Sequence, residues 1–220
     1  LCRLLGLEPP LRRIEAFDIS NTGGSDIVAS MVVFEGMQPY KNEYRTYAVK
    51  SLENQDDYGA MREVLERRFG KAGGRPDLIL LDGGAAHAAV GREVLYKYSL
   101  DIPLYGMVKD SRHKTRALVD FQGLEVGLDS SPAAFAAVAA IQDEAHRFAI
   151  NYHRKKHVKS GLKSVFDGVN RVGKARKALL MRHFKSLKGI KSASLEELCA
   201  VIPKNAAKNV YNYFHENRED

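Results

Sequence analysis

Two acidic side chains stand in apolar segments that are typical of β-strands. Asp18 lies in the middle of IEAFDIS, residues 14–20, and Asp82 follows the apolar part of DLILLDGG, residues 77–84. Aspartate is depleted in strands, and a buried carboxylate is costly unless it is paired or binds a metal. Asp82 alone could be a turn residue or a helix N-cap, but this explanation is weaker for Asp18, because strand continues on both sides of it. Two such acids on neighbouring strands would repel each other, and a divalent cation relieves that repulsion.

A third group comes from the helical segment IQDEAHRFAINYH, residues 141–153. Asp143, His146 and Arg147 are three or four residues apart and therefore share one face of a helix. Carboxylate oxygens suit Mg²⁺ or Mn²⁺, and such a site can activate water and stabilise the leaving oxygen of a phosphodiester. Taken alone, His146 could be an ordinary half-buried histidine, and Asp143 and Arg147 could form an ion pair one helical turn apart.

The elements that must position these groups follow from turn residues and hydrophobic periodicity. The first part of the chain predicts an antiparallel meander, because segments rich in Gly, Pro and Asn separate its apolar runs. The next part alternates strand and helix, which predicts parallel strands. A long helix follows, with Ser131 as its N-cap and Pro132 at its first position. The predicted strands are 14–20, 27–35, 43–50, 77–82, 103–108, 115–121 and 124–128, and the predicted helices are 56–69, 85–98 and 131–156.

This order of elements matches an α/β fold of the ribonuclease H-like type, a mixed sheet flanked by helices. In that fold the first strand carries a central acid, and an adjacent strand after the first helix ends in a second acid. Asp18 and Asp82 would therefore converge. We predict a ribonuclease H-like domain at 1–157, a polar Gly-containing linker at 158–165 and a small all-α domain at 166–220.

Composition narrows the class of protein. The 220 residues are 45% hydrophobic, which is typical of a globular chain. No apolar run is as long as a membrane span, and no signal peptide is visible. Cys2 and Cys199 are too few for a disulfide framework or a cysteine zinc site, so we expect a cytoplasmic protein. The chain does not begin with Met, which suggests a piece of a longer protein.

The positive charge is concentrated in the last third of the chain. Residues 151–220 hold 16 Lys and Arg against 6 Asp and Glu, whereas residues 1–150 hold 18 against 21. The simplest interpretation is a module that binds nucleic acid, attached to a nearly neutral body. A solvated basic face is the alternative.

Four motifs carry a resemblance to a known family. FDIS, DDYGAMREVLERRF, PDLILLDGG and DEAHRFAINYHRKK, in this order and spacing, resemble the C-terminal half of the UvrC family, the incising component of the excinuclease of bacterial nucleotide excision repair. The resemblance covers nearly the whole chain. It implies a ribonuclease H-like endonuclease with an Asp-Asp-His site for Mn²⁺ or Mg²⁺, matched here by Asp18, Asp82 and His146.

The resemblance also implies substrates and partners. In this family the C-terminal half makes the incision on the 5′ side of a lesion in double-stranded DNA, and a separate N-terminal nuclease domain makes the 3′ cut. That domain, and the segment that meets UvrB after UvrA has acted, are not in this chain. No recognition-helix pattern is present, so DNA binding is expected to be independent of sequence, and no membrane is involved.

Further site residues follow from the same resemblance. Asp57 in DDYGAM matches an acid that the family associates with incision, although it could instead act at the N-terminus of the helix that it begins. The segment VKDSRHKT matches a family loop whose basic side chains could contact phosphates or form a solvated basic loop. These side chains are Lys109, Arg112, His113 and Lys114.

The chain departs from the family at two positions near the motifs. Asn21 follows FDIS where the family often has His, and Ala85 follows DGG where the family typically has Lys. A lysine there would help to orient the scissile phosphate. Lys109 or His87 could substitute for it.

The family ends in tandem helix-hairpin-helix motifs, which hold DNA backbones through main-chain N–H groups of a Gly-containing hairpin. Residues 167–184, followed by 186–198, match the first copy, although Gly168 and Gly173 are five apart and the family's Gly-X-Gly is not intact. The second copy has Lys204 and Asn205 in place of a Gly pair, so it could be a DNA clamp or a packing partner. The phosphate contacts expected in the first copy come from Arg171, Lys174, Arg176 and Lys177.

Two other functions remain open on the sequence alone. Another ribonuclease H-like nuclease, such as a junction resolvase, would generally use an all-carboxylate site, which DEAHRF argues against. A non-catalytic DNA-binding module that kept the fold is favoured by Ala85, but all three residues of the Asp-Asp-His set are present.

Overall fold

The computed structural model describes residues 1–21, 27–49, 56–71, 73–110, 115–166 and 169–215, without the side chains of residues 20, 21 and 153–165. The chain divides into two compact units, Leu1–His153 and Arg154–Asp220. In the described parts of both units, no helix has the length and apolar character needed to cross a membrane.

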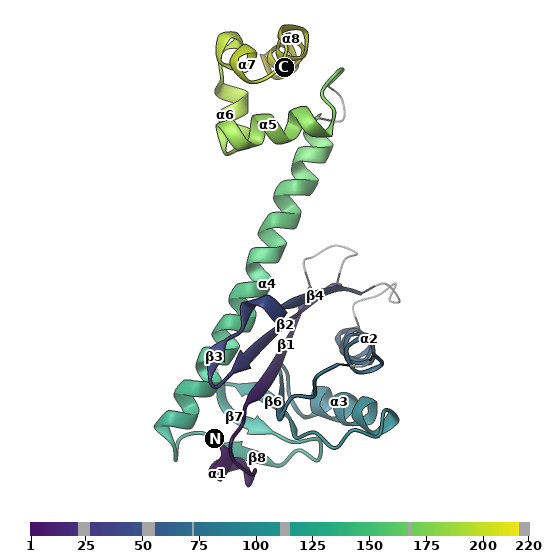
Figure 1. Ribbon diagram of the computed structural model, residues 1–220, viewed down its shortest axis with the longest axis vertical. Coiled ribbons are helices and arrows are strands. Elements are labelled where there is room, and N and C mark those ends of the chain that lie inside the picture. The colour runs from purple at the N-terminus through teal and green to yellow at the C-terminus, as the bar shows by residue number, and fades with distance from the viewer. Residues whose placement is uncertain (22–26, 50–55, 72, 111–114, 167–168, 216–220) are drawn as a thin grey trace. The chain divides into compact units, whose positions relative to one another are not determined.

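The first unit is built on a mixed sheet of eight strands in the order β3-β2-β1-β5-β6-β7-β8, with β4 paired to β2 (Figure 1). Strand β1 pairs antiparallel with β2 and parallel with β5, and β6 continues the parallel part. This confirms the predicted meander followed by parallel strands. The bounds are β1 Arg13–Asn21, β2 Ile27–Glu35, β3 Gln38–Pro39, β4 Arg45–Ala48, β5 Leu78–Leu81, β6 Leu104–Lys109, β7 Thr115–Val119 and β8 Glu125–Gly127.

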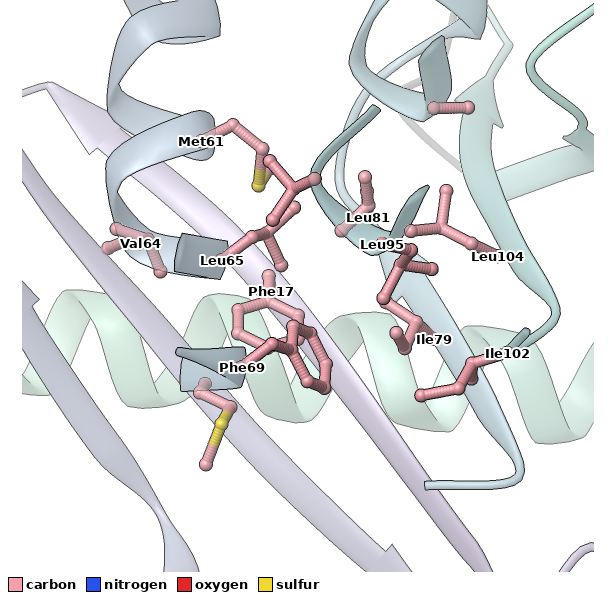
Figure 2. Packing of buried hydrophobic residues seen from close by; sticks show 14 of the residues in the cluster. Phe17, Met61, Val64, Leu65, Phe69, Ile79, Leu81, Leu95, Ile102 and Leu104 are labelled. Atoms are coloured by element: carbon pink, nitrogen blue, oxygen red, sulfur yellow. The ribbon is translucent and has the colours of Figure 1, made fainter. Parts of the chain in front are cut away.

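Alternation along β1 gives each face of the sheet its own core. Phe17 faces helices α2 (Asp57–Phe69) and α3 (Ala85–Lys97), where it joins a cluster that includes Leu65 and Leu81 (Figure 2). Its neighbour Ala16 belongs to a second cluster with the first part of helix α4 (Pro132–Phe166). The fold is therefore a three-layer α/β/α arrangement of the ribonuclease H-like type, in which residues on opposite faces of β1 meet different helices.

Local sequence sets where these helices begin. The side chain of Asp56 accepts a hydrogen bond from the backbone N–H of Gly59, so Asp56 caps α2. The hydroxyl of Ser131 accepts from the backbone N–H of Ala134, and Pro132 is the first residue of α4, as predicted.

One predicted boundary is wrong. Helix α4 does not end near residue 156 but continues to Phe166, through the segment 158–165 that the sequence suggested as a linker. That segment contains one glycine and no proline, and a single glycine costs a helix only about 1 kcal/mol.

The first 13 residues also contain a short helix, α1 (Cys2–Leu5), and a 3₁₀ turn, Lys41–Glu43, precedes β4.

The second unit is a set of short helices around its own apolar cluster. Phe166, Leu180, Leu198 and Val210 are fully buried in it. Ser194 and Glu197 form a capping box that begins one of the helices. The helices are α5 Lys174–Phe184, α6 Leu187–Ser192, α7 Leu195–Val201 and α8 Lys204–His215.

Candidate metal centre

Asp18 is a buried carboxylate with an unsatisfied oxygen. Its position on β1 directs it to the face covered by α4, and only 4% of the residue is exposed. Among the described residues, its Oδ2 atom has no hydrogen-bond partner. Burial raises the pKa of Asp18, and the nearby charge of Asp82 raises it further, while His146 and Lys109 oppose the shift. The negative charge of Asp18 is therefore unfavourable here unless a cation lies close to it.

Asp82 is brought beside Asp18 by the register of the parallel strands. Phe17 pairs with Leu81, and the backbone N–H of Asp82 donates to the carbonyl of Phe17 at 2.8 Å. Each acid follows one of these two paired residues, so both lie at the C-terminal end of the β1–β5 pairing, close together as predicted.

Asp82 already has polar partners from two other elements. The ammonium of Lys109, at the end of β6, lies 2.8 Å from Asp82 Oδ1 and 2.9 Å from Oδ2. The amide of Gln142 on α4 donates to Oδ1 at 3.4 Å and accepts in turn from the hydroxyl of Thr115 on β7. The buried pair Thr115 and Gln142 therefore orients Asp82 by hydrogen bonds, and the ammonium of Lys109 holds it by an ion pair.

His146 completes the group from helix α4. Its Nδ1 lies 3.6 Å from Asp18 Oδ2, which is slightly beyond hydrogen-bond distance. The side chain is 63% exposed, whereas that of Asp18 is 5% exposed. The histidine thus forms the solvent side of the site, within reach of a substrate.

The chemistry of these donors fits a hard divalent cation, because the charges of two carboxylates repel each other and one buried oxygen has no hydrogen-bond partner among the described residues. In the described part of the chain, however, no set of three or more His, Cys, Asp or Glu side chains stands close enough to hold a metal. The ammonium of Lys109 is the cation that Asp82 contacts in this arrangement. Lys109 would therefore have to release Asp82 when a metal binds.

Asp57 and His87 lie on the α2–α3 side of Asp82. Asp57 is exposed in the first turn of α2 and does not cap it, since Asp56 does. The imidazole of His87 is tilted against the ring of Tyr58, with centroids 4.7 Å apart. Burial lowers the pKa of His87, while the charges of Asp57 and Asp82 act in the opposite direction. His87 is thus close enough to feel both carboxylates, near the place where Ala85 begins α3.

The structure corrects the proposed ion pair on α4. Arg147 does not pair with Asp143; it makes two hydrogen bonds to Glu144, at 2.6 and 2.7 Å. Glu144 also accepts from the hydroxyl of Tyr44 at 2.9 Å, so this acid joins α4 to the segment before β4.

The predicted phosphate-contacting residues are placed as follows. Lys109 is at the site itself, and Arg112, His113 and Lys114 lie outside the described residues. In the second unit, Arg171 has a left-handed backbone with φ 66°, and Arg176 donates to its carbonyl. Exposed Lys174 begins α5, and Lys177 lies over the ring of Phe166.

Sequence analysis missed Gln142 and Thr115 as site residues. Gln142 is only 7% exposed and lies among Val138, Ile141 and Ala145, which are buried residues of α4. A polar residue in phase with a buried helical face is the signal that could have found it. Thr115 gives no comparable signal, because threonine is common in strands.

Comparisons with known proteins identify the family of the chain. Residues 2–150 match the model of the UvrC RNAse H endonuclease domain. UvrABC system protein C of Finegoldia magna is 44% identical over 217 residues, which are 93% of this chain and 36% of that protein. The protein of the same name in Clostridioides difficile is 43% identical over 216 residues, 97% of this chain and 35% of that protein.

Among solved structures, human ENDOV matches with a TM-score of 0.41 and 12% identity, over 66% of this chain and 86% of that one. The chain spans little more than a third of the length of the curated relatives that it matches. With its endonuclease-domain match and its identity to these relatives, the chain belongs to the UvrC family.

Proposed function

We propose that this chain is a divalent-metal-dependent DNA endonuclease that makes the 5′ incision beside a lesion in bacterial nucleotide excision repair. The observation that carries the proposal is the buried Oδ2 of Asp18, which lies close to Asp82 and His146 and has no hydrogen-bond partner among the described residues. The UvrC family membership supports the reaction class. We propose the cytoplasm as its location.

Asp18, Asp82 and His146 are the residues that would hold Mn²⁺ or Mg²⁺, with His146 as a ligand or as a base. When bound, such a cation acts as a Lewis acid and lowers the pKa of water. The side chains of the protein do the rest. Gln142 orients Asp82, Lys109 turns from Asp82 toward a phosphate oxygen, and exposed His146 exchanges a proton at the surface of the site.

We propose damaged double-stranded DNA as the substrate, held by its backbone and without sequence preference. The basic residues of the second unit supply phosphate attraction. UvrB, with UvrA acting before it, is the proposed protein partner. Asp57 is proposed to assist incision, because its exposed carboxylate lies near His87 and does not cap α2.

The test is nicking of supercoiled plasmid in Mn²⁺ or Mg²⁺ by the wild type and by Asp18→Asn, Asp82→Asn and His146→Ala. Asp143→Ala is the control, since Asp143 is an exposed acid on the same helix. Metal-dependent nicking that only the three site variants lose would support the proposal. A wild type that binds DNA but does not nick, even with UvrA, UvrB and the full-length protein present, would favour a non-catalytic DNA-binding module.

Gln142→Leu is expected to reduce nicking about 10- to 100-fold, because residues that orient a ligand typically contribute that much. Leucine keeps most of the volume on α4 but cannot donate to Asp82. The control Gln122→Leu changes an exposed glutamine in the turn between β7 and β8 and should leave the rate unchanged.

The change also leaves the buried hydroxyl of Thr115 without its acceptor, which can lower stability. Adding Thr115→Val removes that hydroxyl and should restore the melting temperature but not the nicking rate. Recovery of both together would show that Gln142 acts only through stability.

Lys174→Ala is expected to weaken binding of a short DNA duplex severalfold and to reduce the slope of log Kd against log salt by about one unit. Lys174 is exposed at the first turn of α5, next to Gly173, the N-cap of that helix. The measurement is fluorescence anisotropy from 50 to 200 mM salt. Lys208→Ala on α8 removes one charge from the second copy, and an equal loss there would mean that both copies clamp DNA.

A further inference from the structure

A basic cavity of about 320 Å³ opens between β4, the C-terminal end of α2 and the glycines that precede β5. It lies in the first unit and includes none of the residues assigned above to the metal site. Of its ten lining residues, one is acidic and five are basic. The basic residues are Arg13, Arg45, Arg67, Arg68 and Lys71.

A fully buried acid fixes two of these cations in the wall of the cavity. Glu15 on β1 is 0% exposed and accepts from Arg68 Nε at 2.9 Å and from Arg68 Nη2 at 2.6 Å. Arg13 Nε donates to the same carboxylate at 2.9 Å. Arg68 also donates to the carbonyl of Gly74 at 2.6 Å. The guanidinium of Arg68 is thus held rigidly, as recognition of a planar or tetrahedral oxyanion requires.

Three of the lining arginines are partly balanced by acids, namely Arg13, Arg67 and Arg68. Arg13 contacts Glu35 and Glu43 besides Glu15. Burial lowers the pKa of Arg13, but its hydrogen bonds to Glu43 and Glu15 and the charges of these two acids together raise it. Arg67 is paired with Glu63 across one helical turn. These contacts explain how several cations can stand close together before any ligand binds.

Arg45 and Lys71 form no ion pair with an acid within the described residues. Arg45 donates to two backbone carbonyls, those of Asn42 and Tyr44. Lys71 is exposed. The cavity is therefore lined by Arg45, whose charge acts on Glu43 without an ion pair, by Lys71, and by the two guanidinium groups that Glu15 holds.

We propose that this cavity binds a phosphate group. Arginine forks and a lysine ammonium are the groups that recognise phosphate, and about 320 Å³ is near the lower limit for small-ligand sites. Tyr47 and Met31 supply an apolar side to the cavity, against which a sugar could pack. The phosphate would come either from the DNA backbone or from a free phosphate compound such as a nucleotide.

The DNA source rests on the proposed function. Arg13 precedes Asp18 by five residues on the same strand, which corresponds to about 17 Å. Rise along duplex DNA is about 3.4 Å per step, so this distance is about five steps. Asp18 and the cavity lie on opposite faces of the sheet, so DNA that reached both would have to pass around the sheet.

Binding of inorganic pyrophosphate, followed by isothermal titration calorimetry in EDTA without metal, tests the site. The variant Arg45→Ala with Lys71→Ala removes the two unpaired cations and leaves the Glu15 contacts intact. The control, Arg3→Ala with Arg116→Ala, removes two exposed cations on α1 and β7. We expect the wild type and the control to bind alike and the cavity variant to bind about tenfold or more weakly. No binding by the wild type, or equal binding by the cavity variant and the control, would overturn the proposal.

A second arm identifies the source of the phosphate. The same proteins are titrated into a labelled DNA duplex at several salt concentrations. If the cavity holds a DNA phosphate, the cavity variant should lose one to two units of salt slope relative to the control, about 0.9 for each contact. An unchanged slope with weakened pyrophosphate binding assigns the cavity to a free phosphate compound. Since neither arm measures nicking, failure of the cavity and failure of the nuclease proposal remain distinguishable.

Discussion

Replacement of Asp18 by asparagine is expected to lower metal-dependent nicking by about a thousandfold while the folded protein becomes more stable. Asparagine keeps the shape of the side chain but not the charge that would hold the cation. Several kcal/mol of transition-state stabilisation depend on that cation, and about 4 kcal/mol corresponds to a thousandfold in rate. Plasmid nicking under single-turnover conditions measures the loss.

The gain in stability has a separate cause. In the absence of metal, the charge of Asp18 is disfavoured by burial and by Asp82, and its Oδ2 lacks a partner in the described structure. Removing the charge relieves both costs, so the melting temperature in EDTA should rise. Asp77→Asn is the matched control, because Asp77 accepts from the backbone N–H groups of Arg12 and Arg13 and should lose stability when neutralised.

The two readouts together are diagnostic. Nicking that survives Asp18→Asn would contradict the site assignment. Nicking lost together with a falling melting temperature would mean that Asp18 has a structural role instead. A residue retained for catalysis commonly costs the folded protein stability, and that trade is the pattern expected here.

The placement of Asp18 and Asp82 could be predicted because it depends on periodicity and strand order. IEAFDIS alternates residues of the α2 face with residues of the α4 face, and DLILL is a short run bounded by turn residues. Each predicted strand agrees with an observed strand to within two residues at both of its ends. Such local signals determine where the strands lie in the sequence, and the pairing of β1 with β5 then brings the two carboxylates close together.

The partners of those acids could not be predicted. Lys109 is 27 residues from Asp82, and Gln142 is 60 residues from it. Nothing local distinguishes Lys109 paired with a carboxylate from Lys109 free to meet a phosphate. On α4, Asp143 and Glu144 were both in reach of Arg147, and the choice of Glu144 depends on Tyr44, which approaches from a distant segment. Side-chain pairing of this kind is decided by tertiary contacts.

Glu15→Ala is expected to lower the free energy of unfolding by about 3–5 kcal/mol, because removal of one member of a buried ion pair leaves an uncompensated charge. Glu15 stands beside Phe17 on the α2 face of β1, where it is 0% exposed and holds Arg68 and Arg13. Urea unfolding followed by circular dichroism gives the change. Glu35→Ala is the matched control: it removes a carboxylate from the same Arg13, but Glu35 is 48% exposed, and such a pair contributes about 0–1 kcal/mol.

A second variant separates charge from packing. Glu15→Leu with Arg68→Met replaces the buried pair by apolar side chains of similar size, and such replacements are often neutral or stabilising. Arg13 keeps Glu35 and Glu43 as partners in this variant. If Glu15→Ala destabilises the protein through an unpaired charge, the double variant should recover most of the loss. If both variants unfold at the same urea concentration, cavity formation and not charge explains the effect.

The apolar double variant also tests why the charged cluster of Glu15, Arg13 and Arg68 occupies a position that hydrophobic residues could fill. Buried ion pairs are weak evidence for stability, so their presence here requires another explanation. The contacts of Glu15 place Arg68 in the wall of the basic cavity. We therefore expect the double variant to match the wild type in urea and to lose affinity for pyrophosphate. Stability and affinity that fall together would instead mean that the cluster serves the fold alone.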